Sequence, residues 1–150
     1  MEISLKNELI ANLAWYTTIV VLKMMLMSTL TSVYRLRTSA FANEEDARTF
    51  GSTTKGKPFV YTNAAVERVR RCHLNDIENI IPFVIIGFLY VLTEPAIDTA
   101  IFHFQLFAGC RIAHMFCYLI SIPQPSRFVF YAAGYFATLS MAFRILTALY

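Results

Sequence analysis

Residues Leu9–Tyr34 read LIANLAWYTTIVVLKMMLMSTLTSVY, an apolar run in which Lys23 is the single charged residue. As an α-helix of about 26 residues, this run is about 39 Å long, which exceeds the ~30 Å thickness of the hydrocarbon core of a bilayer. The apolar core of a cleaved signal peptide has only about 7–15 residues. We therefore expect an uncleaved first membrane span, with Lys23 either inside a helix bundle or extended along the helix towards polar surroundings.

The composition of the chain is typical of a membrane protein. Of its 150 residues, 57% are hydrophobic and 15% are charged, whereas soluble domains have about 25% charged residues. At about 20 residues per crossing, the chain has room for about four spanning helices. Five glycines, five prolines and three cysteines argue against a collagen repeat and a disulfide framework. The net charge of +3 gives no reason to expect a nucleic-acid partner.

Three further helices are expected from the other apolar runs and from the prolines that separate them. The run Ile80–Leu92 is too short to cross a bilayer alone, so its helix must also include polar residues that precede it. Pro95 ends this helix, because proline cannot continue a helix interior. The sequence predicts an all-α integral membrane protein, a four-transmembrane-helix bundle that forms a single domain. The domain covers 1–150, with helices at about 9–37, 63–93, 96–120 and 125–149 and a loop at about 38–62.

The basic residues near the expected spans indicate which side of the membrane each loop faces. Eight lysines and arginines lie between the end of the first apolar run and the start of the second. They are Arg35, Arg37, Arg48, Lys55, Lys57, Arg68, Arg70 and Arg71. The next loop, Thr93–Asp98, has two acids and no cation. Because cytosolic loops are enriched in lysine and arginine, we expect the first loop to face the cytosol and both termini to face the opposite side. The polar segment 43–63 is expected to be irregular and to pack back over the mouth of the bundle.

Polar residues follow one face of three expected helices at spacings of three and four residues. The three stripes are Arg68, Arg71, Asn75 and Glu78; Arg111, His114 and Tyr118; and Arg127, Tyr131 and Tyr135. Residues at these spacings share a helix face. A charge at the centre of a bilayer costs about 2.5–3.5 kcal/mol, so such residues face a bundle interior or a wet cavity. All three stripes are expected in the cytosolic half of the bundle.

The cations of this cluster outnumber its acids. The arginines are Arg35, Arg68, Arg71, Arg111 and Arg127, and the acids are Glu67, Asp76 and Glu78. Arginine binds carboxylates through two parallel hydrogen bonds, while Glu78 and Asn75 could hold an amine and an amide. These residues indicate a zwitterionic small molecule with carboxylates, and part of the cluster is also expected to form ion pairs between helices.

Four motifs resemble those of one family of membrane proteins. They are VERVRRCHLNDIENIIPF at 66–83, FANEED at 41–46, GCRIAHMFCYL at 109–119 and PQPSR at 123–127. On these motifs the chain is identified as a member of the MAPEG family, the membrane-associated proteins in eicosanoid and glutathione metabolism, and most resembles its glutathione transferase branch. The resemblance implies a homotrimer in the endoplasmic reticulum membrane, with the mitochondrial outer membrane as a second location. It also implies that glutathione binds between neighbouring subunits near the cytosolic face.

The same resemblance implies which residues hold glutathione and what they do. The matching positions are Arg35, Arg71, His73, Asn75, Glu78, Arg111, His114, Tyr118, Arg127 and Tyr131. The implied reactions are attack of the glutathione thiolate on a hydrophobic electrophile that enters from the lipid bilayer, and reduction of lipid hydroperoxides, without a metal. Arg127 matches the arginine that stabilises the thiolate, and Tyr118 or Tyr131 would donate a second hydrogen bond to sulfur. A nearby cation lowers the pKa of a thiol from its usual value of about 8.5.

Four positions bear on which reaction of the family is expected. Ala47 follows FANEED where glutathione transferase relatives have a reactive cysteine, so activation by modification of that thiol is not expected. Leu74 and Phe128 differ from the arginine and serine of the prostaglandin E synthase branch, whereas Tyr131 matches that branch. A transferase is therefore the main hypothesis. The alternatives are a glutathione-dependent isomerase of the prostaglandin E synthase type, a non-catalytic lipid-binding scaffold and an ion conductor.

Other polar residues and cysteines are expected to have structural roles. Asp76 lies off the polar face of its helix and is expected to be a buried partner of an arginine. His103 is expected to be a core or interface histidine. Cys110 and Cys117 are about 10 Å apart on one helix, too far for a disulfide, and are expected to pack as small apolar residues. For His73, a contact with glutathione and a hydrogen bond to a neighbouring carbonyl are both open.

Overall fold

The computed structural model of the protein describes residues 4–51, 53–54, 57–58 and 60–150. Its elements in chain order are α1 (Glu8–Thr38), α2 (Glu44–Phe50), β1 (Thr53–Thr54), β2 (Lys57–Pro58), α3 (Ala64–Leu92), α4 (Ile97–Leu119) and α5 (Ser126–Leu149). The predicted helical fold class is confirmed, apart from the two short strands.

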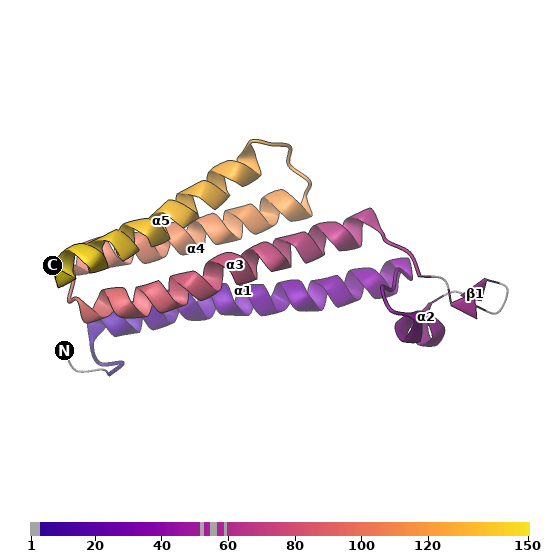
Figure 1. Ribbon diagram of the computed structural model, residues 1–150, viewed down its shortest axis with the longest axis horizontal. Coiled ribbons are helices and arrows are strands. Elements are labelled where there is room, and N and C mark those ends of the chain that lie inside the picture. Colours follow the sequence, from indigo (N-terminus) through magenta and orange to yellow (C-terminus); the bar gives the residue numbers. More distant parts are fainter. Residues whose placement is uncertain (1–3, 52, 55–56, 59) are drawn as a thin grey trace.

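The four long helices form an elongated bundle (Figure 1). α1 packs along α3, and α4 packs along α5, with further contacts from α1 to α4 and from α3 to α5. Both termini and the short α3–α4 connection lie at one end of the bundle, whereas α2 and the strands lie at the other end (Figure 1). One end of the bundle therefore has a short connection, and the other has a long connection with its own secondary structure.

Asparagine caps set the starts of two long helices. Asn7 Oδ1 accepts hydrogen bonds from the amides of Leu9, at 3.0 Å, and Ile10, at 3.4 Å. Asn63 Oδ1 accepts the equivalent bonds at the start of α3. These caps satisfy amides that have no partner within the helix. The bounds of all four long helices differ from the sequence-based ranges by no more than one residue.

The connection between α1 and α3 is not wholly irregular, so this part of the prediction is wrong. It contains α2 and the antiparallel pair β1–β2. Three acids occupy the first turn of α2, where negative charge favours a helix start, and one of them, Glu44, pairs with Arg48 at 3.5 Å. Ala47 and Phe41 are buried and anchor this segment. Lys55 of the same loop lies outside the described residues.

The number of membrane spans is shown only in part. Within the described residues, α1, α3 and α5 are long and apolar enough to cross a membrane. α4 has 23 residues, includes the polar residues His103, Gln105, Arg111 and His114, and is not among these three helices. The membrane-spanning character of the bundle is therefore supported by three helices, and the fourth span stays a prediction.

Aromatic side chains form the centre of the main apolar core. Phe83 stacks on Phe107 with ring centroids 3.8 Å apart and meets Phe104 edge-on at 6.2 Å. All three residues are fully buried. Gly87 of α3 lets α1 approach closely, because a Cβ atom at this position would lie 2.8 Å from Leu13 Cδ1. The core at this contact has no space for an additional side chain.

Replacing Gly87 with valine is expected to lower the free energy of unfolding by about 1–3 kcal/mol, because the added groups overlap with Leu13. Thermal unfolding in detergent measures this loss. The matched double variant Leu13→Ala with Gly87→Val makes room for the new side chain, so its loss should be smaller than the sum of the two single losses. Strictly additive losses would show that overlap with Leu13 is not the cause.

Candidate functional site

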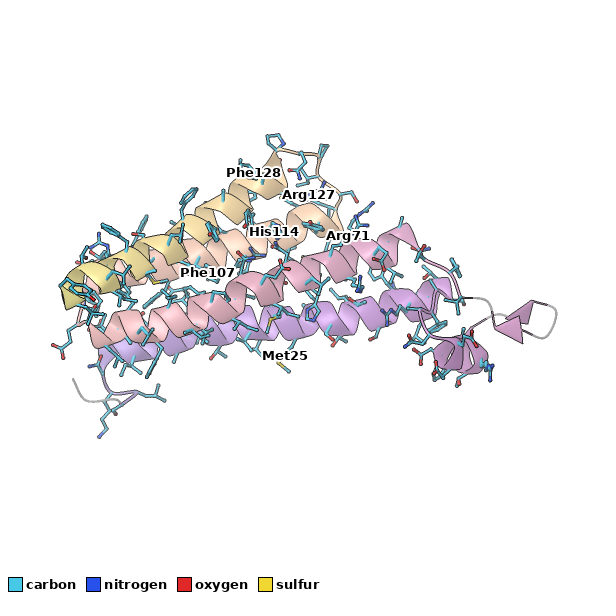
Figure 2. The ribbon with its side chains drawn as sticks, in the orientation of Figure 1. Met25, Arg71, Phe107, His114, Arg127 and Phe128 are labelled. Atoms are coloured by element: carbon cyan, nitrogen blue, oxygen red, sulfur yellow. The ribbon has the colours of Figure 1, made fainter. Side chains whose placement is uncertain are left out.

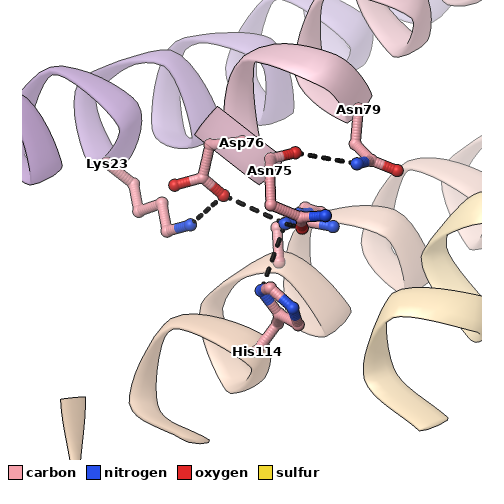
Figure 3. Close-up of polar contacts among 6 residues, drawn as sticks. Lys23, Asn75, Asp76, Asn79 and His114 are labelled. Carbon is pink, nitrogen blue, oxygen red and sulfur yellow. Dashed lines mark hydrogen bonds and ion pairs between the residues drawn. The ribbon is translucent and has the colours of Figure 1, made fainter. Parts of the chain in front are cut away.

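A buried ion-pair network joins α1, α3 and α4 (Figure 3). Asp76 Oδ1 accepts hydrogen bonds from Lys23 Nζ at 2.5 Å and from Arg111 Nη2 at 3.1 Å. Asp76 and Arg111 are fully buried, and Lys23 is only 7% exposed. The prediction that Asp76 is the buried partner of an arginine is confirmed, and Lys23 lies inside the bundle.

Arg111 also fixes two residues of the predicted site. Its Nη2 donates to Asn75 Oδ1 at 2.6 Å and lies 3.2 Å from His114 Nδ1 (Figure 3). Because a guanidinium group can only donate, Nδ1 of His114 must accept, and the proton of a neutral ring then lies on Nε2. Arg111 is thus placed behind Asn75 and His114, where it positions both side chains.

A hollow of about 180 Å³, the Arg127 hollow, opens between α3, α4 and α5. It is lined by Asn75, His114, Tyr118, Gln124, Arg127, Phe128 and Tyr131. The Arg127 guanidinium carbon lies 4.9 Å from the centre of the Tyr118 ring, in a cation–π contact. Arg127 Nε is buried and has no hydrogen-bond partner among the described residues. Within the described part of the chain, Arg127 therefore has an unsatisfied buried donor and packs against an aromatic ring.

A second hollow, the arginine hollow, adjoins the first and has a volume of about 260 Å³. It is lined by Ala64, Glu67, Arg68, Arg71, Tyr118 and Arg127, the last two of which it shares with the Arg127 hollow. Its single acid, Glu67, is paired with Arg70 at 3.4 Å. Figure 2 shows Arg71 and Arg127 towards the end of the bundle where α2 lies. Three arginines and one paired acid make this region suited to an anion.

The other predicted site residues lie elsewhere in the bundle. Arg35 and His73 line a hollow of about 240 Å³, the α1–α3 hollow, with Ser28, Thr31, Ser32, Arg70 and Leu74. Glu78 lines a hollow of about 260 Å³, the Pro82 hollow, with Asn79, Pro82, Ile86, Tyr135, Thr138, Leu139 and Ala142. His73 lies two residues from both Arg71 and Asn75, which is about 200° around a helix. A single chain therefore brings together Arg71, Asn75, His114, Tyr118, Arg127 and Tyr131, but not Arg35, His73 or Glu78.

Three residues of this region were not named as site residues in the sequence analysis. Gln124 and Phe128 line the Arg127 hollow, and Gln124 Oε1 accepts from the Phe128 amide at 3.4 Å. Asn79 is buried and donates to the backbone carbonyl of Asn75 at 2.7 Å. Two sequence features could have indicated them. Gln124 lies just before the start of α5, and Asn79 follows Asn75 at a spacing of four residues.

Two sets of residues have the structural roles that were predicted. His103 is buried, with Nδ1 lying 2.6 Å from the Thr99 carbonyl oxygen and Nε2 lying 2.9 Å from Ser140 Oγ. Its prediction as a core histidine is confirmed. Cys110 and Cys117 are buried and free, which confirms packing roles for both.

One group of side chains has donor atoms close enough to hold a metal ion. Ligand atoms of Cys72, Asp76 and His114 lie within 4.8 Å of one another. The Asp76 carboxylate already accepts from Lys23 and Arg111, two cations whose charges oppose the binding of a further cation. The geometry of the group is therefore better explained by the ion-pair network.

The fold and these hollows define an α-helical membrane protein with two adjoining hollows that are lined by arginines. The sequence profile described as "MAPEG family" matches residues 13–147. The chain therefore belongs to the MAPEG family.

Relatives from two branches of the family are similar over most of the chain. Microsomal glutathione S-transferase 1 of Sus scrofa is 52% identical over 142 residues, which cover 95% of this chain and 92% of the relative. The human protein of the same name is 52% identical over 140 residues, covering 93% and 90% of the two chains. Human prostaglandin E synthase is 38% identical over 130 residues, covering 87% and 83%. Similarity to these transferases is thus greater than to this synthase.

Proposed function

We propose that this protein is a membrane-embedded glutathione transferase with glutathione peroxidase activity. The observation that carries the proposal is the Arg127 hollow, in which a buried donor of Arg127 lacks a protein partner beside the three-arginine hollow. The 52% identity to proteins named microsomal glutathione S-transferase 1 supports the same function. Its membrane would be that of the endoplasmic reticulum, as the word microsomal in these names suggests, with the loop between α1 and α3 in the cytosol.

Glutathione would fill the two adjoining hollows. Its carboxylates match the guanidinium groups of Arg68 and Arg71, which can each donate two parallel hydrogen bonds. Its amide groups match Asn75 and His114, which Arg111 holds in place. The sulfur would then lie beside Arg127, at the start of α5.

Arg127 would act by stabilising the thiolate of glutathione. A thiol has a pKa of about 8.5, and a neighbouring guanidinium lowers it, so more thiolate is present at neutral pH. Tyr118 and Tyr131 line the same hollow and each has a hydroxyl that could donate a second hydrogen bond to sulfur. In conjugation, the thiolate forms a C–S bond and a leaving group such as chloride departs. In peroxide reduction, two glutathione molecules give a disulfide, an alcohol and water.

The electrophile would enter from the lipid. The Pro82 hollow is lined mainly by apolar groups of α3 and α5, including Ile86 and Leu139. Its polar lining residues are Glu78, Asn79, Tyr135 and Thr138. Exposed apolar residues, including Phe136, surround this region of α5. A hydrophobic substrate dissolved in the bilayer could therefore approach α5 without crossing water.

The separation of Arg35 and His73 from Arg127 supports a site shared between subunits of a homotrimer. These two residues lie in the α1–α3 hollow, on the far side of α3 from Arg71 and Asn75. One glutathione molecule cannot reach around α3 within a single subunit. In a trimer, the α1–α3 hollow of one subunit would face the arginine hollow of the next. The mass of the detergent-solubilised protein and the number of glutathione molecules bound per subunit test this arrangement.

Conjugation of glutathione to a hydrophobic chloronitrobenzene by the purified protein tests the proposed function. Incubation with prostaglandin H2 tests the isomerase alternative, because an isomerase yields prostaglandin E2 and a transferase gives a glutathione conjugate with the first substrate. A protein that binds lipid but neither binds glutathione nor forms either product would be a scaffold, and the proposal would be wrong.

Replacing Arg71 with alanine is expected to raise the KM for glutathione about tenfold or more and to change kcat less than about threefold. The reason is that a guanidinium–carboxylate contact present in both ground and transition states contributes to binding alone. Steady-state kinetics with varied glutathione measures both constants. Arg48→Ala removes an exposed cation of α2 and should leave KM within about twofold. A fall in kcat without a change in KM would place Arg71 away from the glutathione carboxylates.

A further inference from the structure

A fifth hollow, the end hollow, lies at the opposite end of the bundle from Arg127, where α3 connects to α4. It has a volume of about 240 Å³ and is lined by Tyr90, Thr93, Pro95, Ala96, Thr99, Arg144, Thr147 and Ala148. These residues come from the end of α3, the start of α4 and the end of α5. Both chain termini lie at this end (Figure 1). The proposed glutathione chemistry uses none of these residues.

The side chains of the end hollow offer donors without protein partners. Tyr90 is 1% exposed, and its hydroxyl has no hydrogen-bond partner in the part of the chain that the structure describes. A buried polar group left without a partner destabilises the folded protein. Arg144 forms none of the ion pairs found among the described residues. An anion in the end hollow would therefore satisfy a hydroxyl and a guanidinium group together.

The N-terminus of α4 adds backbone amides to these donors. Its N-cap residue is Ala96, whose side chain accepts no hydrogen bond from the first turn. Amides at an uncapped helix start attract anions. Two nearby acids, Glu94 in the α3–α4 connection and Asp98 in the first turn of α4, do not line the end hollow. The described side chains that line the end hollow therefore include one cation, Arg144, and no acid.

The surface beside the end hollow is apolar. Phe143, Leu146 and Leu149 of α5 are 68%, 59% and 69% exposed, respectively. In a membrane these side chains would contact acyl chains, and the long side chain of Arg144 would extend from among them towards the headgroups. An anion with attached acyl chains could therefore satisfy both parts of this surface.

We propose that the end hollow binds a phosphate group through Arg144, Tyr90 and the first amides of α4. Arginine suits phosphate because its planar donors match two phosphate oxygens. The phosphate can belong to a phospholipid of the leaflet opposite to the glutathione site or to a free phosphate ion. This second anion site is independent of the proposed transferase activity.

The test uses the intact purified protein in a nonionic detergent, with dihexanoyl phosphatidic acid and inorganic phosphate as separate probes. A ligand that binds the folded protein raises the midpoint of thermal unfolding in a saturable way, which gives an apparent affinity. Arg144→Gln is expected to weaken the affinity for the active probe at least about tenfold, and Tyr90→Phe about three- to tenfold. The Tyr90 variant loses only a hydroxyl, so it also serves if the Arg144 variant folds poorly.

Lys6→Gln is the matched control, because Lys6 is an exposed cation at the same end of the protein but outside the hollow. Its affinity should stay within about twofold of wild type. Stabilisation by the lipid alone identifies a phospholipid headgroup, and equal stabilisation by both probes identifies a phosphate ion. The proposal is overturned if neither probe stabilises the protein, or if both substitutions leave the affinity unchanged, as they would for binding in the arginine hollow.

Discussion

Replacing Arg127 with alanine is expected to lower kcat for glutathione conjugation about 100-fold or more. Arg127 carries the positive charge that both hollows share, and its buried Nε has no partner among the described residues. Loss of one preorganised group that stabilises a developing or reacting anion costs about 10²–10³ in rate. The KM for glutathione should change less than about threefold, because the proposed contacts of Arg68 and Arg71 with its carboxylates would remain.

Two measurements separate this role from a structural one. The ultraviolet absorbance of bound thiolate should shift to higher pH in Arg127→Ala, since the cation that lowers the thiol pKa is gone. Arg127→Lys retains a charge without the guanidinium fork and should recover part of the rate. A general structural defect would lower the rate without shifting the pH at which thiolate absorbance appears, and lysine would not restore part of the rate. Full turnover in Arg127→Ala would remove Arg127 from the mechanism.

The long helices could be predicted because their causes are local. The apolar run around Lys23 has the length of a span, and Pro95 and Pro125 mark the points where helices end or begin. The bounds of α2 have a different cause. A seven-residue helix is too short to be stable alone. The segment is kept in place by the burial of Ala47, within α2, and of Phe41, which precedes it. Sequence periodicity carries no information about such contacts.

Helical spacing also predicted more of the candidate site than of the network behind it. Spacings of three and four residues correctly put Arg71 and Asn75 on one side of α3, since both line hollows with residues of α4 and α5. How deeply each side chain is buried in the bundle could not be predicted in the same way. Arg111 occupies the same stripe as His114 but is fully buried by contacts with Asp76, 35 residues away, and Lys23 meets the same carboxylate from 53 residues away.

Replacing Asp76 with asparagine is expected to lower the free energy of unfolding in detergent by about 3–5 kcal/mol. Asp76 is the shared acceptor for two buried cations, Lys23 and Arg111, and its loss leaves both without a compensating charge. The effect should extend to catalysis, because Arg111 holds Asn75 and His114 at the edge of the Arg127 hollow. Thermal unfolding and glutathione conjugation on the same samples measure the two effects.

A second substitution tests whether charge imbalance is the cause. Lys23→Met with Asp76→Asn removes one of the two stranded cations, so this double variant should recover part of the stability that Asp76→Asn loses. Glu45→Gln changes an exposed acid of α2 and should stay within about 0.5 kcal/mol of wild type. If the double variant is less stable than Asp76→Asn alone, then Lys23 stabilises the bundle through its packing and not through its charge. Recovery would instead show that the buried carboxylate is needed because two positive charges meet there.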